Sequence, residues 1–198
     1  MSEEVEPDFH PRYCDSEKTY EYRILNRKFP VPTERLYSYF YHYKLDVDKM
    51  REATSYLIGR HDFASFCGSG AQVKTTIRTV TGIEVFRDGD IVTIRVSGTG
   101  FLYNMVRIIS GTLIEIGNGQ YPPERMQKIL DAKDRSAAGP TAPAHGLTLM
   151  GIQFFDYNII LVLCVKWTNF GLLFQFLCYD MHKIVLDWTF LLWKCARL

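Results

Sequence analysis

The sequence has no Cys-x-x-Cys pair, no internal repeat and no large excess of charge of either sign. The five cysteines are scattered along the chain, and their number is odd. Both features argue against a disulfide framework, and the scattering argues against a zinc site built from paired cysteines. Residues 1–6 are acidic, the opposite of the basic start of a secretory or mitochondrial leader. We therefore expect a cytoplasmic protein with reduced thiols.

What the chain has in quantity is apolar and aromatic side chains. Of its 198 residues, 47% are hydrophobic and 14% are aromatic. That composition supports one compact domain, or one domain with an appendage, and argues against disorder over most of the chain. The net charge of +1 says little about partners, because a neutral total can combine a basic face with an acidic one.

The first half of the chain alternates extended and helical patterns. Residues 9–25 are predicted to be extended, because Tyr20, Tyr22 and Ile24 alternate with polar residues. Prolines then open a loop at residues 30–43, and an apolar stripe predicts a helix at 46–58 with Asp46 as its N-cap. Strands at 83–87 and 90–96 are joined by Asp88-Gly89, the strongest short hairpin signal.

The second half continues the mixture. Residues 101–116 carry apolar side chains at helical spacing, and the Gly-Asn-Gly at 117–119 ends that helix. Another helix starts at the two prolines of positions 122–123, a stiff loop covers residues 139–143, and residues 147–155 return as a strand. Interleaved strands and helices with an antiparallel hairpin predict an α+β fold.

Residues 157–198 differ from the rest. They are rich in Leu, Phe, Trp and Ile, without a clean period, and polar residues interrupt the apolar run. A membrane-spanning helix needs about twenty predominantly apolar residues, so this segment is marginal and no membrane role is expected. An atypical tail, a packed helix and a membrane segment remain open, the first being favoured.

Four stretches resemble the TruA family of tRNA pseudouridine synthases. The first is Phe-His-Pro-Arg-Tyr at 9–13 followed by Lys-Thr-Tyr-Glu-Tyr at 18–22, and the second is Gly-Arg-His-Asp-Phe-Ala-Ser-Phe at 59–66. The third is Phe-Leu-Tyr-Asn-Met-Val-Arg-Ile-Ile-Ser-Gly at 101–111, and the fourth is Ala-Gly-Pro-Thr-Ala-Pro-Ala-His-Gly-Leu at 138–147. Each alone is weak, but four in the family's order are specific.

The resemblance implies an isomerase that detaches uracil from its ribose, turns the base and rejoins it through carbon, with no cofactor and no metal. It also implies a mixed, largely antiparallel sheet with helices packed on one face, and a homodimer that shares tRNA. We expect a TruA-like C-terminal domain at 9–156, between an acidic lead-in at 1–8 and the tail at 157–198.

The family's nucleophile is the aspartate of a Gly-Arg-Thr-Asp-Ala-Gly-Val-His motif, which this sequence does not contain. Asp62 follows a Gly-Arg-x pattern, but the residues after it match the structural second stretch instead. We therefore expect Asp62 to serve in a turn. The resemblance then implies a catalytic half that lacks its nucleophile and is inactive alone.

Two residues are candidates for catalysis by resemblance. Tyr20 matches the family's active-site tyrosine, whose ring can stack on uracil and whose hydroxyl can reach a proton near the reacting carbon. Arg107 matches an arginine that pairs with the catalytic aspartate. Because that partner is missing, we predict an unpaired guanidinium in an open cleft that it shares with Tyr20.

RNA contacts are expected from basic residues that flank the motif strands and from one apolar residue after the Gly-Pro-Thr-Ala-Pro loop. They are Arg12, Lys18, Arg23, Lys74, Arg78 and Leu147, together with Tyr20. For each basic residue the alternative is an ordinary solvent-exposed charge with no role in RNA binding. His145 is not expected to act as a base.

Three functions remain open at this point. The first is the catalytic half of a tRNA pseudouridine synthase acting on the anticodon stem-loop. The second is a non-catalytic RNA-binding remnant of the same fold. The third is a remnant held at a membrane by its apolar tail, with no role in RNA.

Overall fold

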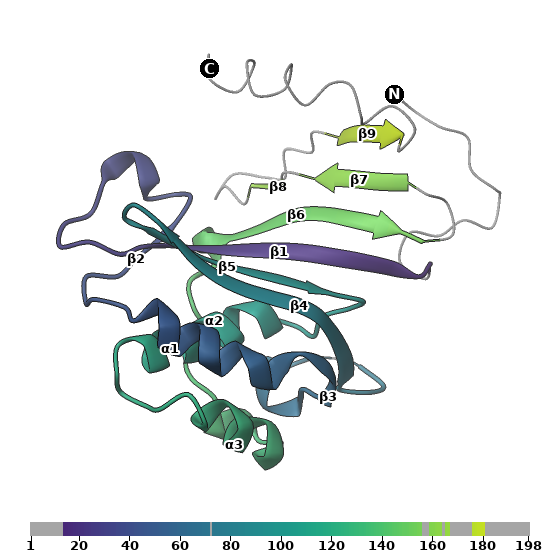
Figure 1. The fold of residues 1–198 in the computed structure, drawn as a ribbon. Coiled ribbons are helices and arrows are strands. Elements are labelled where there is room, and N and C mark those ends of the chain that lie inside the picture. The colour runs from purple at the N-terminus through teal and green to yellow at the C-terminus, as the bar shows by residue number, and fades with distance from the viewer. Residues whose placement is uncertain (1–13, 72, 156–158, 164, 167–175, 181–198) are drawn as a thin grey trace.

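The computed structural model of the chain describes residues 14–71, 73–155, 159–163, 165–166 and 176–180 (Figure 1). Its centre is a strongly twisted sheet in the order β3-β4-β5-β1-β6-β7-β9, with β2 beside β1 and β8 beside β6. The strands are β1 (Ser16–Leu25), β2 (Tyr39–Phe40), β3 (Gly59–Asp62), β4 (Ile77–Asp88), β5 (Ile91–Gly98), β6 (Leu147–Phe154), β7 (Ile159–Leu163), β8 (Val165–Lys166) and β9 (Phe176–Asp180).

The sheet is mixed and largely antiparallel, as predicted. The short β2 runs parallel to β1, whereas the other pairings between described strands are antiparallel. The β4–β5 hairpin turns after Asp88, where Gly89 has a φ of +54° that suits glycine. The hairpin prediction is therefore confirmed, although β4 starts at Ile77, earlier than its alternation suggested.

Among the described residues, three α-helices cover one side of the sheet (Figure 1). They are α1 (Val47–Thr54), α2 (Met105–Gly117) and α3 (Arg125–Ala132). The carboxylate of Asp46 accepts hydrogen bonds from the backbone of Asp48 and Lys49, so the predicted N-cap of α1 is confirmed. The α+β class is confirmed with it.

The helix boundaries correct two predictions. α1 ends at Thr54 and passes through a 3₁₀ turn, Ser55–Leu57, which leaves Ile58 49% exposed rather than on the apolar stripe. α2 begins at Met105, later than predicted, because Asn104 is left-handed at φ 59° and cannot continue a right-handed helix.

The core lies between the helices and the face of β1 that carries Tyr22 and Ile24. Both side chains are fully buried, as are Ile109 and Leu113 of α2. A buried aliphatic side chain of this size contributes about 1.5–3 kcal/mol to stability. The alternation predicted for β1 is thus confirmed, and it places Tyr20 on the same face as Tyr22.

Part of the apolar tail lies within the described residues. There the backbone forms β7 (Ile159–Leu163), β8 (Val165–Lys166) and β9 (Phe176–Asp180), which extend the sheet beyond β6. In the part of the chain that the structure describes, no helix has the length and apolarity needed to cross a membrane. The acidic lead-in and the other tail residues lie outside the described residues.

Candidate active site

Tyr20 lies in the middle of β1, half-buried, with its ring edge-on to that of Phe101 at a centroid distance of 5.3 Å. Its hydroxyl forms no hydrogen bond with any described residue. Burial raises the pKa of Tyr20, so the phenol stays protonated at neutral pH. The side chain therefore offers an aromatic edge and an uncommitted hydroxyl.

Phe101 reaches Tyr20 because β5 ends in closely packed glycine. A Cβ on Gly98 would lie 2.6 Å from the carbonyl oxygen of Thr79 and 3.2 Å from the ring of Phe101. Gly98 pairs with both Lys18 and Val80, so any larger residue would push the neighbouring strands apart. The chain can then fold back over the sheet toward α2.

Arg107 projects from the first turns of α2 and is half-buried. Its Nε donates to the carbonyl oxygen of Ala142 at 2.7 Å, and its Nη1 donates to Oδ1 of Asn104 at 2.9 Å. The guanidinium is therefore hydrogen-bonded to two neutral acceptors. No carboxylate of the described residues lies within ion-pair distance of it. The two acceptors fix the plane of the group, and Nη2 makes no hydrogen bond to the part of the chain that the structure describes.

The loop at 138–146 packs tightly on both α2 and β1. A Cβ on Gly111 would lie 1.9 Å from the carbonyl oxygen of Pro140, and the backbone of Ala142 donates to the carbonyl of Arg107 at 3.1 Å. Ser110, the residue before Gly111, is fully buried.

Tyr22 joins β1 to this loop. Its hydroxyl donates to the carbonyl oxygen of Pro143 at 2.8 Å, and the close approach of Gly146 leaves no room for a Cβ. Burial raises the pKa of Tyr22 far above its ordinary value, Tyr39 adds to the rise, and the charge of Arg107 acts against it. The charge of Arg107 thus lies close enough to Tyr22 to influence the pKa of its hydroxyl.

Tyr20 and Arg107 lie in one neighbourhood without touching. Tyr20 and Tyr22 are about 6.6 Å apart along the same face of β1. Phe101 contacts the first and Arg107 acts on the second. No hydrogen bond, ion pair or ring contact joins Tyr20 directly to Arg107 in the described ranges. The first, third and fourth motif stretches therefore meet around β1.

The second motif stretch is structural. Phe63 and Phe66 are fully buried, and the hydroxyl of Ser65 donates to the carbonyl of Ile129. Oδ1 of Asp62 accepts hydrogen bonds from the hydroxyl of Thr76 at 2.5 Å and from the backbone of Ala64. The turn role expected for Asp62 is confirmed, and those bonds lower the pKa of its carboxyl.

The protein-family comparison matches residues 53–155 to a model described as tRNA pseudouridine synthase. Among the curated relatives, tRNA pseudouridine synthase A 2 of Clostridium tetani is 53% identical over 148 residues, 75% of this chain and 60% of that protein. The tRNA pseudouridine synthase A of Bacillus licheniformis is 47% identical over 77% of this chain and 62% of that protein, and that of Bacillus subtilis is 42% identical over 78% and 62%.

The chain belongs to the TruA family of tRNA pseudouridine synthases. It spans about three fifths of the length of the relatives that it matches. The family resemblance seen in the four stretches is confirmed.

The basic residues proposed for RNA contacts occupy different places in this TruA-family fold. Lys18 lies on the face of β1 that carries Tyr20, and its Nζ donates to Ser16, while burial lowers the pKa of Lys18. Arg78 lies against Gly100 and donates to the carbonyl of Thr75. Both therefore flank the Tyr20 neighbourhood.

Other members of that set lie elsewhere. Arg23 projects from the opposite face of β1 and lies 3.9 Å from Glu34, so the structure does not bring it to Tyr20. Lys74 is exposed in the loop before β4, and Leu147 pairs with Tyr22 rather than with Tyr20. Arg12 lies outside the described residues.

Three residues beside the site were not proposed from the sequence: Tyr22, Phe101 and Asn104. Tyr22 alternates in step with Tyr20, so the sequence does indicate that both lie on one face of the strand. The hydrogen bond from Tyr22 to Pro143 spans 121 residues, and no local pattern indicates it. The left-handed Asn104 has a weak signal, since Asn tolerates that conformation better than most residues. Within the described residues, no cluster of three metal-ligating side chains occurs.

Proposed function

We propose that this chain supplies the tyrosine and arginine side of a tRNA pseudouridine synthase site, acting on uridine in the anticodon stem-loop. The observation that carries the proposal is the arrangement of Arg107, whose guanidinium is held by Ala142 and Asn104 and has no carboxylate partner among the described residues. A group fixed in this way is prepared to accept a carboxylate.

In the proposed reaction, the bond between N1 of uracil and the ribose carbon breaks, and a bond from C5 to the same carbon forms. C5 then loses its proton, and N1, which the ribose has left, takes up a proton from the solvent, so that the product is an isomer of uridine. The aspartate that the family uses as nucleophile would be held ionised and oriented by Arg107, which lowers a carboxyl pKa by about one to three units. Tyr20 would stack on the unpaired base and hydrogen-bond near C5.

The base must first leave its stack, at a cost of a few kcal/mol. Lys18 and Arg78 flank Tyr20, so they are the basic residues best placed to hold phosphates while this happens. The sharing of tRNA between two copies of the chain, and contacts from Arg12, Arg23, Lys74 and Leu147, stay predictions.

Because the sequence contains no Gly-Arg-Thr-Asp motif and Asp62 is committed to a turn, we propose that the 198-residue polypeptide alone does not isomerise uridine. The test is tritium release from tRNA transcribed with [5-³H]uridine. The chain alone should release none. A joined protein, in which the part of the Clostridium tetani relative that this chain does not cover is fused to it, should release tritium from the anticodon arm.

An RNA-binding remnant is the second candidate function. It predicts that the joined protein binds the anticodon stem-loop but releases no tritium, although the same segment is active in its own protein. Turnover by the chain alone would contradict both candidates, since neither provides a nucleophile within these 198 residues.

A further inference from the structure

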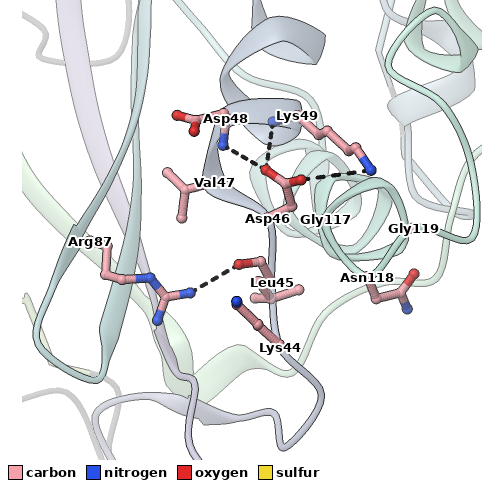
Figure 2. A pocket seen from close by; sticks show the side chains of 10 residues that line it. All are labelled: Lys44, Leu45, Asp46, Val47, Asp48, Lys49, Arg87, Gly117, Asn118 and Gly119. Carbon is pink, nitrogen blue, oxygen red and sulfur yellow. Dashed lines mark hydrogen bonds and ion pairs between the residues drawn. The ribbon is translucent and has the colours of Figure 1, made fainter.

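A basic hollow lies at the end of β1 remote from Lys18. It has a volume of about 430 Å³ and is lined by Asn26, Arg27, Lys28, His42, Lys44, Leu45 and Arg87, and is called the Asn26 hollow below. No carboxylate is among these lining residues. A second hollow of about 550 Å³ shares Lys44, Leu45 and Arg87 with it (Figure 2).

The backbone around the hollow is fixed by one buried amide. Asn26 is 8% exposed, and its Nδ2 donates to the carbonyls of Tyr41 and Tyr43 at 2.9 and 2.6 Å. Its Oδ1 accepts from the backbone of Leu45 at 3.2 Å and from Nη2 of Arg87 at 2.8 Å. Asn26 thus ties the segment at 41–45 and the arginine side chain from β4 to the end of β1.

This arrangement holds the guanidinium of Arg87 in place. Arg87 also donates to the carbonyl of Leu45 at 3.1 Å, and Figure 2 shows it reaching from β4 toward that residue with Lys44 close by. The segment at 41–45 is also held by a bond between backbone groups, from the amide of Tyr41 to the carbonyl of Leu25 at 2.9 Å. A rigid surface loses less conformational entropy on binding than a flexible one.

Two carboxylates near the hollow are engaged in ion pairs. Asp90 lies 3.2 Å from Arg27, and Asp46 caps α1 and lies 3.6 Å from Lys49. By contrast, Lys28, Lys44 and Arg87 have no ion-pair partner in the described part of the chain. The hollow therefore presents an uncompensated positive charge.

Exposed aromatic rings border these cations. Tyr43 is 60% exposed, and its ring centroid lies 3.8 Å from that of His42 with the two rings tilted by 40°. Phe29 is 64% exposed and lies 5.5 Å below the ammonium of Lys28. Large exposed rings beside uncompensated cations are the combination that binds single-stranded nucleic acid, with phosphates on the charges and bases on the rings.

We propose that the Asn26 hollow binds the sugar-phosphate backbone of RNA and that Tyr43 and Phe29 stack on unpaired bases. The proposal rests on the proposed function for its choice of RNA. The hollow begins about 20 Å along the strand direction from Tyr20. It would therefore hold a part of the RNA remote from the reacting uridine and set its register.

The test measures binding of the 198-residue chain to a fluorescein-labelled anticodon stem-loop RNA over a range of salt concentrations. The variant Lys28→Ala/Lys44→Ala should weaken binding by about tenfold. The slope of log affinity against log salt should fall by about 0.7 for each phosphate that the variant no longer neutralises. Tyr43→Ala should weaken binding about fivefold with the slope unchanged, and Tyr43→Phe should bind as the parent does.

The matched control is Arg60→Ala/Lys128→Ala, which removes the same charge from exposed positions outside the hollow. Equal effects of the two double variants would overturn the proposal. It would also be overturned if Lys28→Ala/Lys44→Ala changed the sedimentation coefficient while the RNA affinity per copy stayed the same, since the surface would then be a contact between proteins.

The joined protein separates this proposal from the proposed function. Tritium release with RNA binding insensitive to Lys28→Ala/Lys44→Ala overturns the Asn26 hollow and leaves the proposed function standing. Loss of RNA binding in that variant, with no tritium release by the parent joined protein, overturns the proposed function and supports the hollow.

Discussion

Arg107 and Tyr22 hydrogen-bond to consecutive carbonyl oxygens of one loop, those of Ala142 and Pro143. One bond comes from α2 and the other from β1, so the loop connects the helix to the central strand. Because Tyr20 lies two residues before Tyr22 on the same face, the loop also fixes where Arg107 lies relative to Tyr20.

Replacing Tyr22 by Phe should lower stability and change its dependence on pH. The hydroxyl bond to Pro143 is removed, at a cost of about 1 kcal/mol. The raised pKa of Tyr22 means that the unfolded chain loses its proton near pH 10 while the folded chain keeps it. Stability should therefore fall by about 1.4 kcal/mol per pH unit above pH 10 from this group.

Urea unfolding of the parent and of Tyr22→Phe at pH 8 to 11 checks this, because the difference between the two proteins cancels the other titrating groups. The difference should be constant below pH 10 and should shrink above it. A constant difference across the whole range would contradict the raised pKa.

Two variants at Asn104 should distinguish the effect of backbone strain on stability from the effect of losing the hydrogen bond to Arg107. Asn104→Ala loses the acceptor at Oδ1 and keeps a left-handed φ, whereas Asn104→Gly loses the acceptor but adopts that φ without strain. We expect the Ala variant to be about 1 kcal/mol less stable than the Gly variant in urea unfolding. Equal stabilities would show that the left-handed conformation is not fixed at this position.

Gly111→Ala should destabilise the chain although alanine favours a helix. The new Cβ would meet the carbonyl oxygen of Pro140 at 1.9 Å, so the loop at 138–143 must move, at a cost of about 1–3 kcal/mol. Gly82→Ala is the matched control, because nothing lies within 4 Å of a Cβ there. It should be neutral or slightly stabilising, and a loss of stability in both variants would contradict the tight loop packing.

Asp62→Asn in the joined protein should leave tritium release within about twofold of the parent. The Asp62 carboxylate accepts hydrogen bonds from Thr76 and Ala64 and lies 3.7 Å from Lys133, and all three are structural partners at the end of β3. A nucleophile would lose essentially all activity in this variant. Loss of tritium release in a variant with parental circular dichroism would restore Asp62 as a catalytic candidate.

The sequence predicted the elements whose signals are local. Asp88-Gly89 specifies a hairpin through turn geometry, Asp46 caps α1 with its own side chain, and the alternation at Tyr20, Tyr22 and Ile24 identifies a strand with one buried face. Each signal acts within a few residues. The corresponding predictions were therefore right apart from boundaries.

What the sequence could not predict depends on distant contacts. The bond from Arg107 to Ala142 spans 35 residues, and the close approach of Gly111 to Pro140 joins α2 to a loop that follows α3. The start of α2 is set by the left-handed Asn104, which a helical pattern alone does not reveal. Arg23 shows the opposite case, since strand alternation already placed it on the face away from Tyr20.

The most direct measurement is tritium release by the joined protein carrying Tyr20→Phe or Arg107→Lys, with Arg60→Ala as the control. We predict losses on the order of a hundredfold or more for the first two, with RNA affinity within about twofold and the control at the parental rate. Full activity in Tyr20→Phe and Arg107→Lys would contradict the assignment of these side chains to the reaction.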